Sequence, residues 1–179
     1  MCELTCLKFK KLRENAVLPN RKTSGAAGYD ISLPTDFSHI KQNDLMGIGD
    51  YEVSYVCMPD GNKVPSFVIR CNNTVLIPLS FAVEIPEGYY GEIKPRSSLF
   101  LDGWTIEGII DSDYRGEVKL MIRAPIKAPY HFNDRTVSLL AGERVAQMVI
   151  KKYESWEPVW VDELSDTERG DGGFGSTGV

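Results

Sequence analysis

The chain has 179 residues, a formal net charge of −5, four cysteines and two histidines, a length that fits one domain with a substantial buried core. The acidic balance argues against a general binder of nucleic acid or of anionic membranes, and no apolar run approaches the roughly 20 residues of a membrane span. Because the cysteines form no CxxC pair, we expect no zinc site. Because the N-terminus has no signal-peptide apolar block, we expect an intracellular protein, cytoplasmic or nuclear, with reduced cysteines.

The first unusual region is residues 36–73. Within it, two strand-like runs at residues 51–58 and 64–70 flank Pro59-Asp60-Gly61-Asn62, a combination typical of a tight turn. We therefore predict a β-hairpin arm there.

The rest of the chain is dominated by alternating apolar and polar residues. Val118, Leu120 and Ile122 share one face of an expected strand, with charged residues on the other face. Short strands punctuated by Gly and Pro indicate an all-β antiparallel sandwich, barrel or jelly roll. The expected strands span residues 74–85 (one or two, marked by Pro78, before a turn at Pro86-Glu87-Gly88), 89–94, 104–111, 145–153 and 159–164, and the helical candidate lies around residues 134–140.

Polar segments interrupt this pattern, and each has an ordinary explanation beside a chemical one. Asp30 stands at a strand entry, where simple turn chemistry also explains a carboxylate. Residues 95–99 carry an arginine and two hydroxyls directly after a strand, which fits a phosphate cradle or a solvated turn. Residues 108–118 place two aspartates, a tyrosine and an arginine in a tight turn, either a site or a charged hairpin tip. The polar Gln147 interrupts an apolar strand. It either belongs to a site or simply lies on the solvent-facing side of the strand.

The chain ends in a glycine-rich tail, residues 169–179, which cannot bury a core. Its spacing from Gly170 to Ser176 matches a P-loop, but serine stands where the lysine should be and no helix can follow, so a P-loop is rejected. Glycine N–H groups can wrap an anion, Arg169 adds a forked positive charge, and Phe174 adds a flat face for a base. Either a disordered tail or a mobile flap over a nucleoside phosphate is consistent with this composition.

Together these segments, in this order, closely resemble the five motifs of the homotrimeric dUTP pyrophosphatases (dUTPases). Each motif is weak alone, but five in order with compatible gaps are a strong signal across residues 27–178. The resemblance implies a jelly-roll domain over residues 1–168, an active-site tail at residues 169–179, and a homotrimer whose sites are shared between subunits. In this family the tail of one subunit closes over a pocket formed by the other two.

The reaction implied by the resemblance is hydrolysis of dUTP to dUMP and pyrophosphate, which keeps uracil out of DNA and supplies dUMP for dTMP synthesis. Asp111 is the expected general base, activating water for in-line attack on the α-phosphorus. Mg²⁺ is expected to be held mainly by the substrate phosphates and water, with no protein metal ligand. Neither nucleic acid nor a membrane is an expected partner.

The resemblance also implies a role for each matching residue. The phosphates are expected to bind Arg96, Ser97 and Ser98 with help from Gln147, while Tyr114 lies against the deoxyribose and occupies the space of a 2′-hydroxyl. Asp30 is expected to steady neighbouring polar groups. Backbone groups at Gly108, Ile110 and Lys119 are expected to pair with uracil, and the tail to contribute Arg169 on the terminal phosphate, Phe174 stacked on uracil, and Gly175, Ser176 and Thr177 as hydrogen-bond donors.

The sequence departs from the family pattern at a few places. Ser98 stands where many members have glycine, and Lys119 where some do, but backbone contacts survive both changes. Residues 36–73 include an insertion on the order of 25 residues beyond a compact member, and a smaller excess lies near residues 125–136. Both additions are expected at the periphery.

Other functions also fit part of the pattern. A dCTP deaminase shares the jelly roll but does not need this tail, and it would release ammonia from dCTP. A regulatory or partner-binding dUTPase homologue would act through its insertion, alone or besides catalysis.

Overall fold

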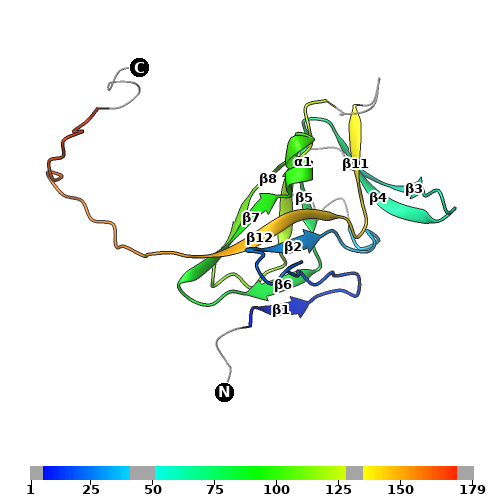
Figure 1. Ribbon diagram of the computed structural model, residues 1–179, viewed down its shortest axis with the longest axis horizontal. Helices are drawn as coiled ribbons and strands as arrows, with labels where there is room; N and C mark the ends of the chain where they lie inside the picture. The colour runs from blue at the N-terminus through cyan, green and yellow to red at the C-terminus, as the bar shows by residue number, and fades with distance from the viewer. Residues whose placement is uncertain (1–5, 41–50, 128–134, 173–179) are drawn as a thin grey trace.

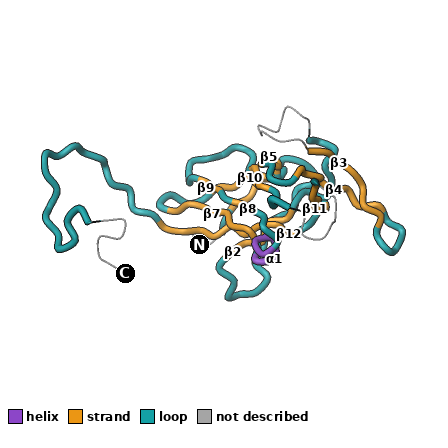
Figure 2. The backbone as a smooth tube through the Cα atoms, turned by 90° about the horizontal axis from the view of Figure 1, so that it is seen from above, coloured by secondary structure: helices purple, strands orange, loops and turns teal. Residues whose placement is uncertain are grey.

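The computed structural model describes residues 6–40, 51–127 and 135–172. In these ranges nearly all regular structure is strand (Figures 1 and 2). The elements are β1 (Lys8–Lys11), β2 (Gly28–Ser32), β3 (Tyr51–Cys57), β4 (Lys63–Arg70), β5 (Thr74–Pro78), β6 (Phe81–Glu84), β7 (Tyr89–Pro95), α1 (Ser97–Leu101), β8 (Thr105–Ile106), β9 (Gly108–Ile110), β10 (Lys119–Arg123), β11 (Thr136–Leu140) and β12 (Arg144–Lys152).

The strands pair antiparallel in small sheets that share one core. Over the described ranges the strand orders are β2-β12-β7-β9, β5-β10-β8, β11-β4-β3 and β1-β6. Ile31 and Met148 on the first of these sheets, Ile77 and Leu120 on the second, and Phe67 on the third are fully buried in a single apolar cluster. An all-β antiparallel fold of the jelly-roll type, as the sequence predicts, is therefore confirmed.

The alternating pattern in β10 explains its burial. Leu120 and Ile122 are fully buried, whereas Lys119, Met121 and Arg123 are exposed, because successive side chains of a strand point to opposite faces. The sequence predicts one or two strands at residues 74–85, and the structure has two, β5 and β6.

The predicted hairpin is present and is tied to the body. β3 pairs with β4 from Tyr51↔Ile69 to Cys57↔Lys63, and Gly61 turns the chain with a φ of +84°, a conformation that favours glycine. The base is buried: Phe67 is stacked on Tyr51 at 4.8 Å between ring centroids and meets the Phe37 ring edge-on at 5.6 Å. β11 adds to the other side of β4, so residues from both family-atypical regions form one sheet.

Some sequence predictions are wrong. The helical candidate at residues 134–140 is instead β11, because its residues pair with β4 from Thr136↔Arg70 to Leu140↔Ser66; residues 128–134 lie outside the described ranges. The strand expected at residues 159–164 is absent from this part of the described chain, where the backbone is extended and exposed. The short helix α1 follows β7, at a segment that the sequence left open between a phosphate cradle and a solvated turn.

A further difference concerns the predicted hairpin at residues 108–118. β9 pairs with β7, whereas β10 pairs with β5 and β8, so the two strands belong to different sheets and not to one hairpin. The run at residues 104–111 likewise divides into β8 and β9 on separate sheets. The connection from β9 to β10 therefore crosses between sheets.

The chain leaves the body after β12. Residues 153–172 extend away from it as an arm, on the side opposite the β3–β4 hairpin (Figures 1 and 2). Trp156, Val159 and Leu164 are at least 77% exposed and Trp160 is fully exposed. In a single subunit these apolar side chains have no core to join.

Candidate active site

A buried carboxylate, Asp30, draws basic and amide side chains together at one end of the β2-β12-β7-β9 sheet. Asp30 is 5% exposed. Arg144 Nη1 donates to its Oδ2 at 2.9 Å, and Gln147 Nε2 donates to its Oδ1 at 3.1 Å. Arg96 Nε lies 4.0 Å from the same Oδ1. Asp30 thus holds the side chains of Arg144 and Gln147 by hydrogen bonds.

An irregularity in β12 makes this arrangement possible. Residues three apart in a regular strand face opposite sides of the sheet, so Arg144 and Gln147 would not both reach Asp30. The register of β12 against β2 shifts between Arg144 and Ala146, and the extra residue of such a bulge returns both side chains to one side. Arg144 is not among the residues that the sequence predicts for the site, because the alternation pattern does not reveal a bulge.

The protonation of Asp30 is set by opposing effects. Burial raises the pKa of the carboxyl group, but hydrogen bonds from Gln147 and Arg144 and the charges of Arg96 and Arg144 together outweigh it. The pKa therefore lies below its ordinary value, and Asp30 is an anion at neutral pH.

Beside this cluster lies a pocket of about 560 Å³ with polar and apolar lining residues. Arg96, Ser97 and Gln147 line it, together with Thr105 and Glu107. Ser97 begins α1, and the first N–H groups of a helix have no partner within the helix. The predicted phosphate-binding residues Arg96, between β7 and α1, Ser97 in α1 and Gln147 in β12 thus line one pocket. Ser98, in the first turn of α1, is exposed.

The predicted general base lies in a different place. Asp111 is exposed directly after β9 and lines a pocket of about 770 Å³ with Asp113, Arg115 and Tyr153. The turn is held by Tyr114 N–H, which donates to the Asp111 carbonyl at 3.2 Å, and by Arg115 Nη1, which donates to the Ser112 carbonyl at 2.6 Å.

The residues predicted to contact the nucleoside surround the same turn. Gly108 and Ile110 lie in β9, an edge strand of its sheet within the described chain, so one side of its backbone is not used by another strand. The Ile110 side chain is buried, and its backbone pairs with Gly91 of β7. Lys119 begins β10 and is exposed, and Tyr114 is 44% exposed with its hydroxyl donating to the Glu117 carbonyl at 3.0 Å.

The described part of the tail, residues 169–172, does not line either pocket. Arg169 lies on the extended arm, where its Nε donates to the Gly172 carbonyl at 2.9 Å. Phe174, Gly175, Ser176 and Thr177 lie outside the described residues. A single subunit therefore presents the predicted site in parts: Arg96 in one pocket, Asp111 in another and Arg169 on the arm.

The described ranges contain neither a cluster of metal-binding side chains nor a helix suited to span a membrane. No group of three or more His, Cys, Asp and Glu side chains is placed there to hold a metal ion. Nor does any helix of these residues have the length and apolar character needed to cross a membrane.

The described chain is an all-β antiparallel fold in which Arg96, Asp111 and Arg169 lie apart. The family model for dUTPase matches residues 64–178. The chain belongs to the dUTPase family.

Curated relatives agree over nearly the whole chain. A deoxyuridine 5′-triphosphate nucleotidohydrolase of Hydrogenobaculum sp. (strain Y04AAS1) is 40% identical over 177 residues, covering 97% of this chain and 98% of the relative. The enzyme of that name from Arabidopsis thaliana is 36% identical, covering 96% of this chain and 82% of the relative.

Solved structures agree with the fold. A dUTPase of Staphylococcus bacteriophage 80alpha with dUPNHPP has a TM-score of 0.66 and 26% identity, covering 98% of this chain and 99% of that one. A dUTPase variant from phage phi11 of S. aureus, described with a structural Mg(II) ion, has a TM-score of 0.64 and 23% identity, covering 89% and 98%. The second likeness bears on the fold alone.

Proposed function

We propose that this dUTPase family member hydrolyses dUTP to dUMP and pyrophosphate in sites that three identical subunits share. The main support for a shared site is that its proposed parts lie far from one another within one subunit. Arg96 and Asp111 line different pockets, and Arg169 lies on an arm that extends away from both. A closed site then requires parts from neighbouring subunits.

Asp111 acts as the general base. Its carboxylate accepts a proton from water, the water oxygen forms a bond to the α-phosphorus, and the bond from that phosphorus to the bridging oxygen breaks. Pyrophosphate leaves and dUMP remains. Asp111 is exposed beside an open pocket on a turn held by Tyr114 and Arg115, which supports this role. General base catalysis typically supplies about 10²–10⁴-fold, and positioning supplies much of the rest.

The triphosphate binds at Arg96, Ser97 and Ser98. Gln147 already donates one N–H to Asp30, and a carboxamide nitrogen has a second N–H, which is left for a phosphate oxygen. Asp30 contributes by fixing Gln147 and Arg144, not by touching the anion. This division supports a cradle that is arranged before substrate arrives.

The nucleoside lies at the turn between β9 and β10. Backbone groups at Gly108, Ile110 and Lys119 pair with the uracil edge, and Tyr114 lies against the deoxyribose. Within the described chain β9 pairs with β7 alone, and β8 pairs with β10 at Ile122 and Arg123, which supports a base that pairs with the second side of β9 and of β10 near Lys119. Cytosine would leave buried polar groups unpaired, at about 1–3 kcal/mol each.

The arm carries the last part of the site to a neighbour. Arg169 holds the terminal phosphate, Phe174 stacks on uracil, and Gly175, Ser176 and Thr177 donate hydrogen bonds. The exposed apolar residues Trp156 and Trp160 support docking of the arm on another subunit, since burying such rings is strongly favourable.

Mg²⁺ would be held mainly by the triphosphate and water, where it would neutralise phosphate charge. Asp111 and Asp113 line the pocket, and their carboxylates can accept hydrogen bonds from water on the ion, which supports this assignment.

One assay tests the proposal. Pyrophosphate and ammonia release are measured with dUTP, UTP, dTTP and dCTP for the wild type and for Asp111→Asn. Pyrophosphate from dUTP is expected to dominate, and the substitution should lower its rate by about 10²–10⁴-fold while a non-hydrolysable dUTP analogue still binds. Unchanged turnover in the variant would remove Asp111 from the mechanism, and ammonia from dCTP as the main product would indicate a deaminase.

A further inference from the structure

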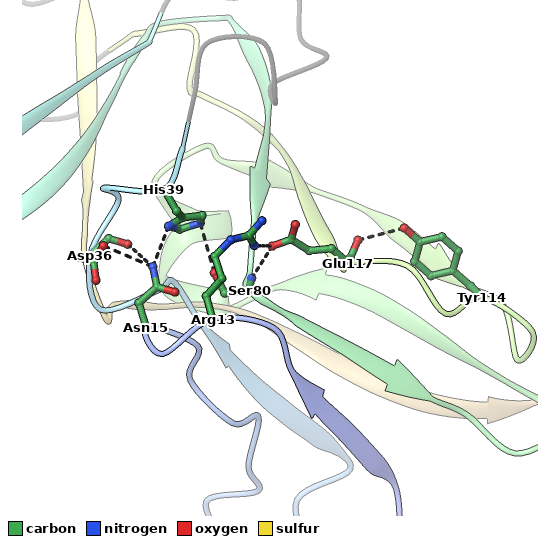
Figure 3. A network of polar contacts seen from close by, with 7 residues as sticks. All are labelled: Arg13, Asn15, Asp36, His39, Ser80, Tyr114 and Glu117. Carbon is green, nitrogen blue, oxygen red and sulfur yellow. Dashed lines mark hydrogen bonds and ion pairs between the residues drawn. The ribbon is translucent and has the colours of Figure 1, made fainter.

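A network of polar contacts connects the N-terminal segment to Tyr114 (Figure 3). It runs from Asn15 and His39 through Ser80 to Glu117 and the tyrosine hydroxyl. None of Arg13, Ser80 and Glu117 belongs to the proposed substrate-binding set. Their contacts nevertheless end on the side chain that faces the sugar.

Glu117 joins the two ends of this network through two different groups. Its side-chain Oε1 forms an ion pair with Arg13 Nη1 and accepts a hydrogen bond from the Ser80 N–H at 2.9 Å. Its backbone carbonyl accepts the hydrogen bond from the Tyr114 hydroxyl at 3.0 Å. The side chain of Glu117 is 17% exposed and that of Arg13 is 40% exposed. The carboxylate thus fixes the residue whose carbonyl receives the tyrosine.

Ser80 provides a rigid base for Glu117. It is fully buried between β5 and β6, with a φ of +62° that is unusual for a residue with a side chain. Its carbonyl accepts from the Leu12 N–H at 2.9 Å, and its hydroxyl lies 3.2 Å from His39 Nε2. Since Ser80 is held from several sides, its N–H marks a fixed position for the Glu117 carboxylate.

The tyrosine ring has little freedom of its own. A Cβ added to Gly116 would lie 2.5 Å from the Tyr114 hydroxyl oxygen and 2.6 Å from Cζ, so the ring rests directly against the glycine backbone. The hydroxyl then has the Glu117 carbonyl as its described acceptor. Gly116 supports the ring face, and Glu117 sets the direction of its hydroxyl.

We propose that Glu117, held by Arg13 and Ser80, is a positioning residue that fixes the Tyr114 ring and thereby sets the discrimination of dUTP from UTP. This inference rests on the proposed contact of Tyr114 with the deoxyribose. If the carboxylate loses its ion pair, the Glu117 backbone and the ring can shift, and a 2′-hydroxyl gains room. Selectivity should therefore change more than turnover of dUTP.

The test measures kcat and KM for dUTP and UTP with Arg13→Ala, Arg13→Lys and Tyr114→Ala. Arg13→Ala should lower the ratio of kcat/KM for dUTP over UTP by about tenfold, because a hydrogen-bonded charge is lost, with kcat for dUTP nearly unchanged. Arg13→Lys should restore most of the ratio. The matched control is Lys11→Ala, which removes an ion pair with Glu14 on the same segment and should leave the ratio unchanged.

A double variant separates this inference from the proposed function. Arg13→Ala should add no further loss of selectivity in a Tyr114→Ala background, since both act on one contact. If Tyr114→Ala leaves the ratio unchanged, the assignment of Tyr114 to the sugar fails. If Tyr114→Ala changes the ratio but Arg13→Ala does not, the positioning role of Glu117 is wrong while the sugar contact stands. The same conclusion follows if the losses of selectivity from the two substitutions add up in the double variant. Thermal unfolding of each variant shows whether a change in selectivity accompanies a loss of fold.

Discussion

Two regions project from opposite sides of the body, and they differ in what they leave exposed. The β3–β4 hairpin places Phe67 and Ile69 fully in the core, with its exposed apolar side chains, Val53 and Tyr55, on β3. In the C-terminal arm, residues 153–172, Tyr153 meets the Tyr90 ring edge-on, but the large apolar side chains beyond it are at least 56% exposed.

The two regions therefore differ in whether their apolar side chains are packed within their own chain. The hairpin base completes its packing within one chain, so β3 and β4 are a stable part of the fold. The arm needs a surface that its own chain does not supply, and it leads to the residues proposed to close the site. We therefore expect catalysis to depend on the arm and folding to depend on the hairpin base.

The largest expected effect is on catalysis when the tail is removed. Deleting residues 169–179 should lower kcat/KM for dUTP by about 10³-fold or more, because an arginine clamp on the phosphates is lost. The trimer should persist, since Trp156 and Trp160 remain. Pyrophosphate release and light scattering measure the two properties, and a normal rate after the deletion would contradict the closing-tail model.

The next effect is on stability, at the hairpin base. Phe67→Ala should lower the free energy of unfolding by about 3–5 kcal/mol, because a fully buried ring between Phe37 and Tyr51 is removed. Tyr55→Ala is the matched control at a position 64% exposed, where a change within about 0.5 kcal/mol is expected. Urea unfolding measures both, and equal effects would mean that the base is not part of the core.

A smaller effect is expected at Asp30, and it depends on pH. Because the folded pKa is lowered, the carboxylate stabilises the fold above its unfolded pKa of about 3.9, and this contribution is lost as the pH falls through the folded value. Asp30→Asn should cost about 1–3 kcal/mol at pH 7 and less below pH 4.

The exposed pair of Lys8 and Glu84 offers a control for Asp30. Glu84→Gln should leave the unfolding midpoint nearly unchanged at either pH, since water solvates both partners. An Asp30→Asn effect that is equally large at pH 3 and pH 7 would disprove the electrostatic origin of this stabilisation.

Local patterns in the sequence predict much of this fold. Alternation places β10 and its buried face, and Pro59-Asp60-Gly61-Asn62 marks the turn of the hairpin, because both depend on neighbouring residues. The pairing partners do not follow from such patterns. β11 is strand because β4 offers it an edge, and β9 and β10 pair with β7 and β5 although they are close in sequence.

The candidate site shows the same division. Arg96, Ser97 and Gln147 follow from their motifs, and the structure brings them to one pocket. Arg144 depends on a bulge, and Glu117 depends on Ser80 and Arg13, which are 37 and 104 residues away in sequence. Contacts set by long-range packing are not visible in local patterns.

Subunit mixing tests the shared site most directly. Asp111→Asn subunits and subunits lacking residues 169–179, each nearly inactive alone, are unfolded together, refolded as a mixture and assayed for pyrophosphate release from dUTP. If the tail of one subunit closes over Asp111 of another, an equal mixture should regain about a quarter of the wild-type rate per site, because half of the subunits supply each intact part. A mixture that forms mixed trimers but stays as inactive as its two components would show that each subunit closes its own site.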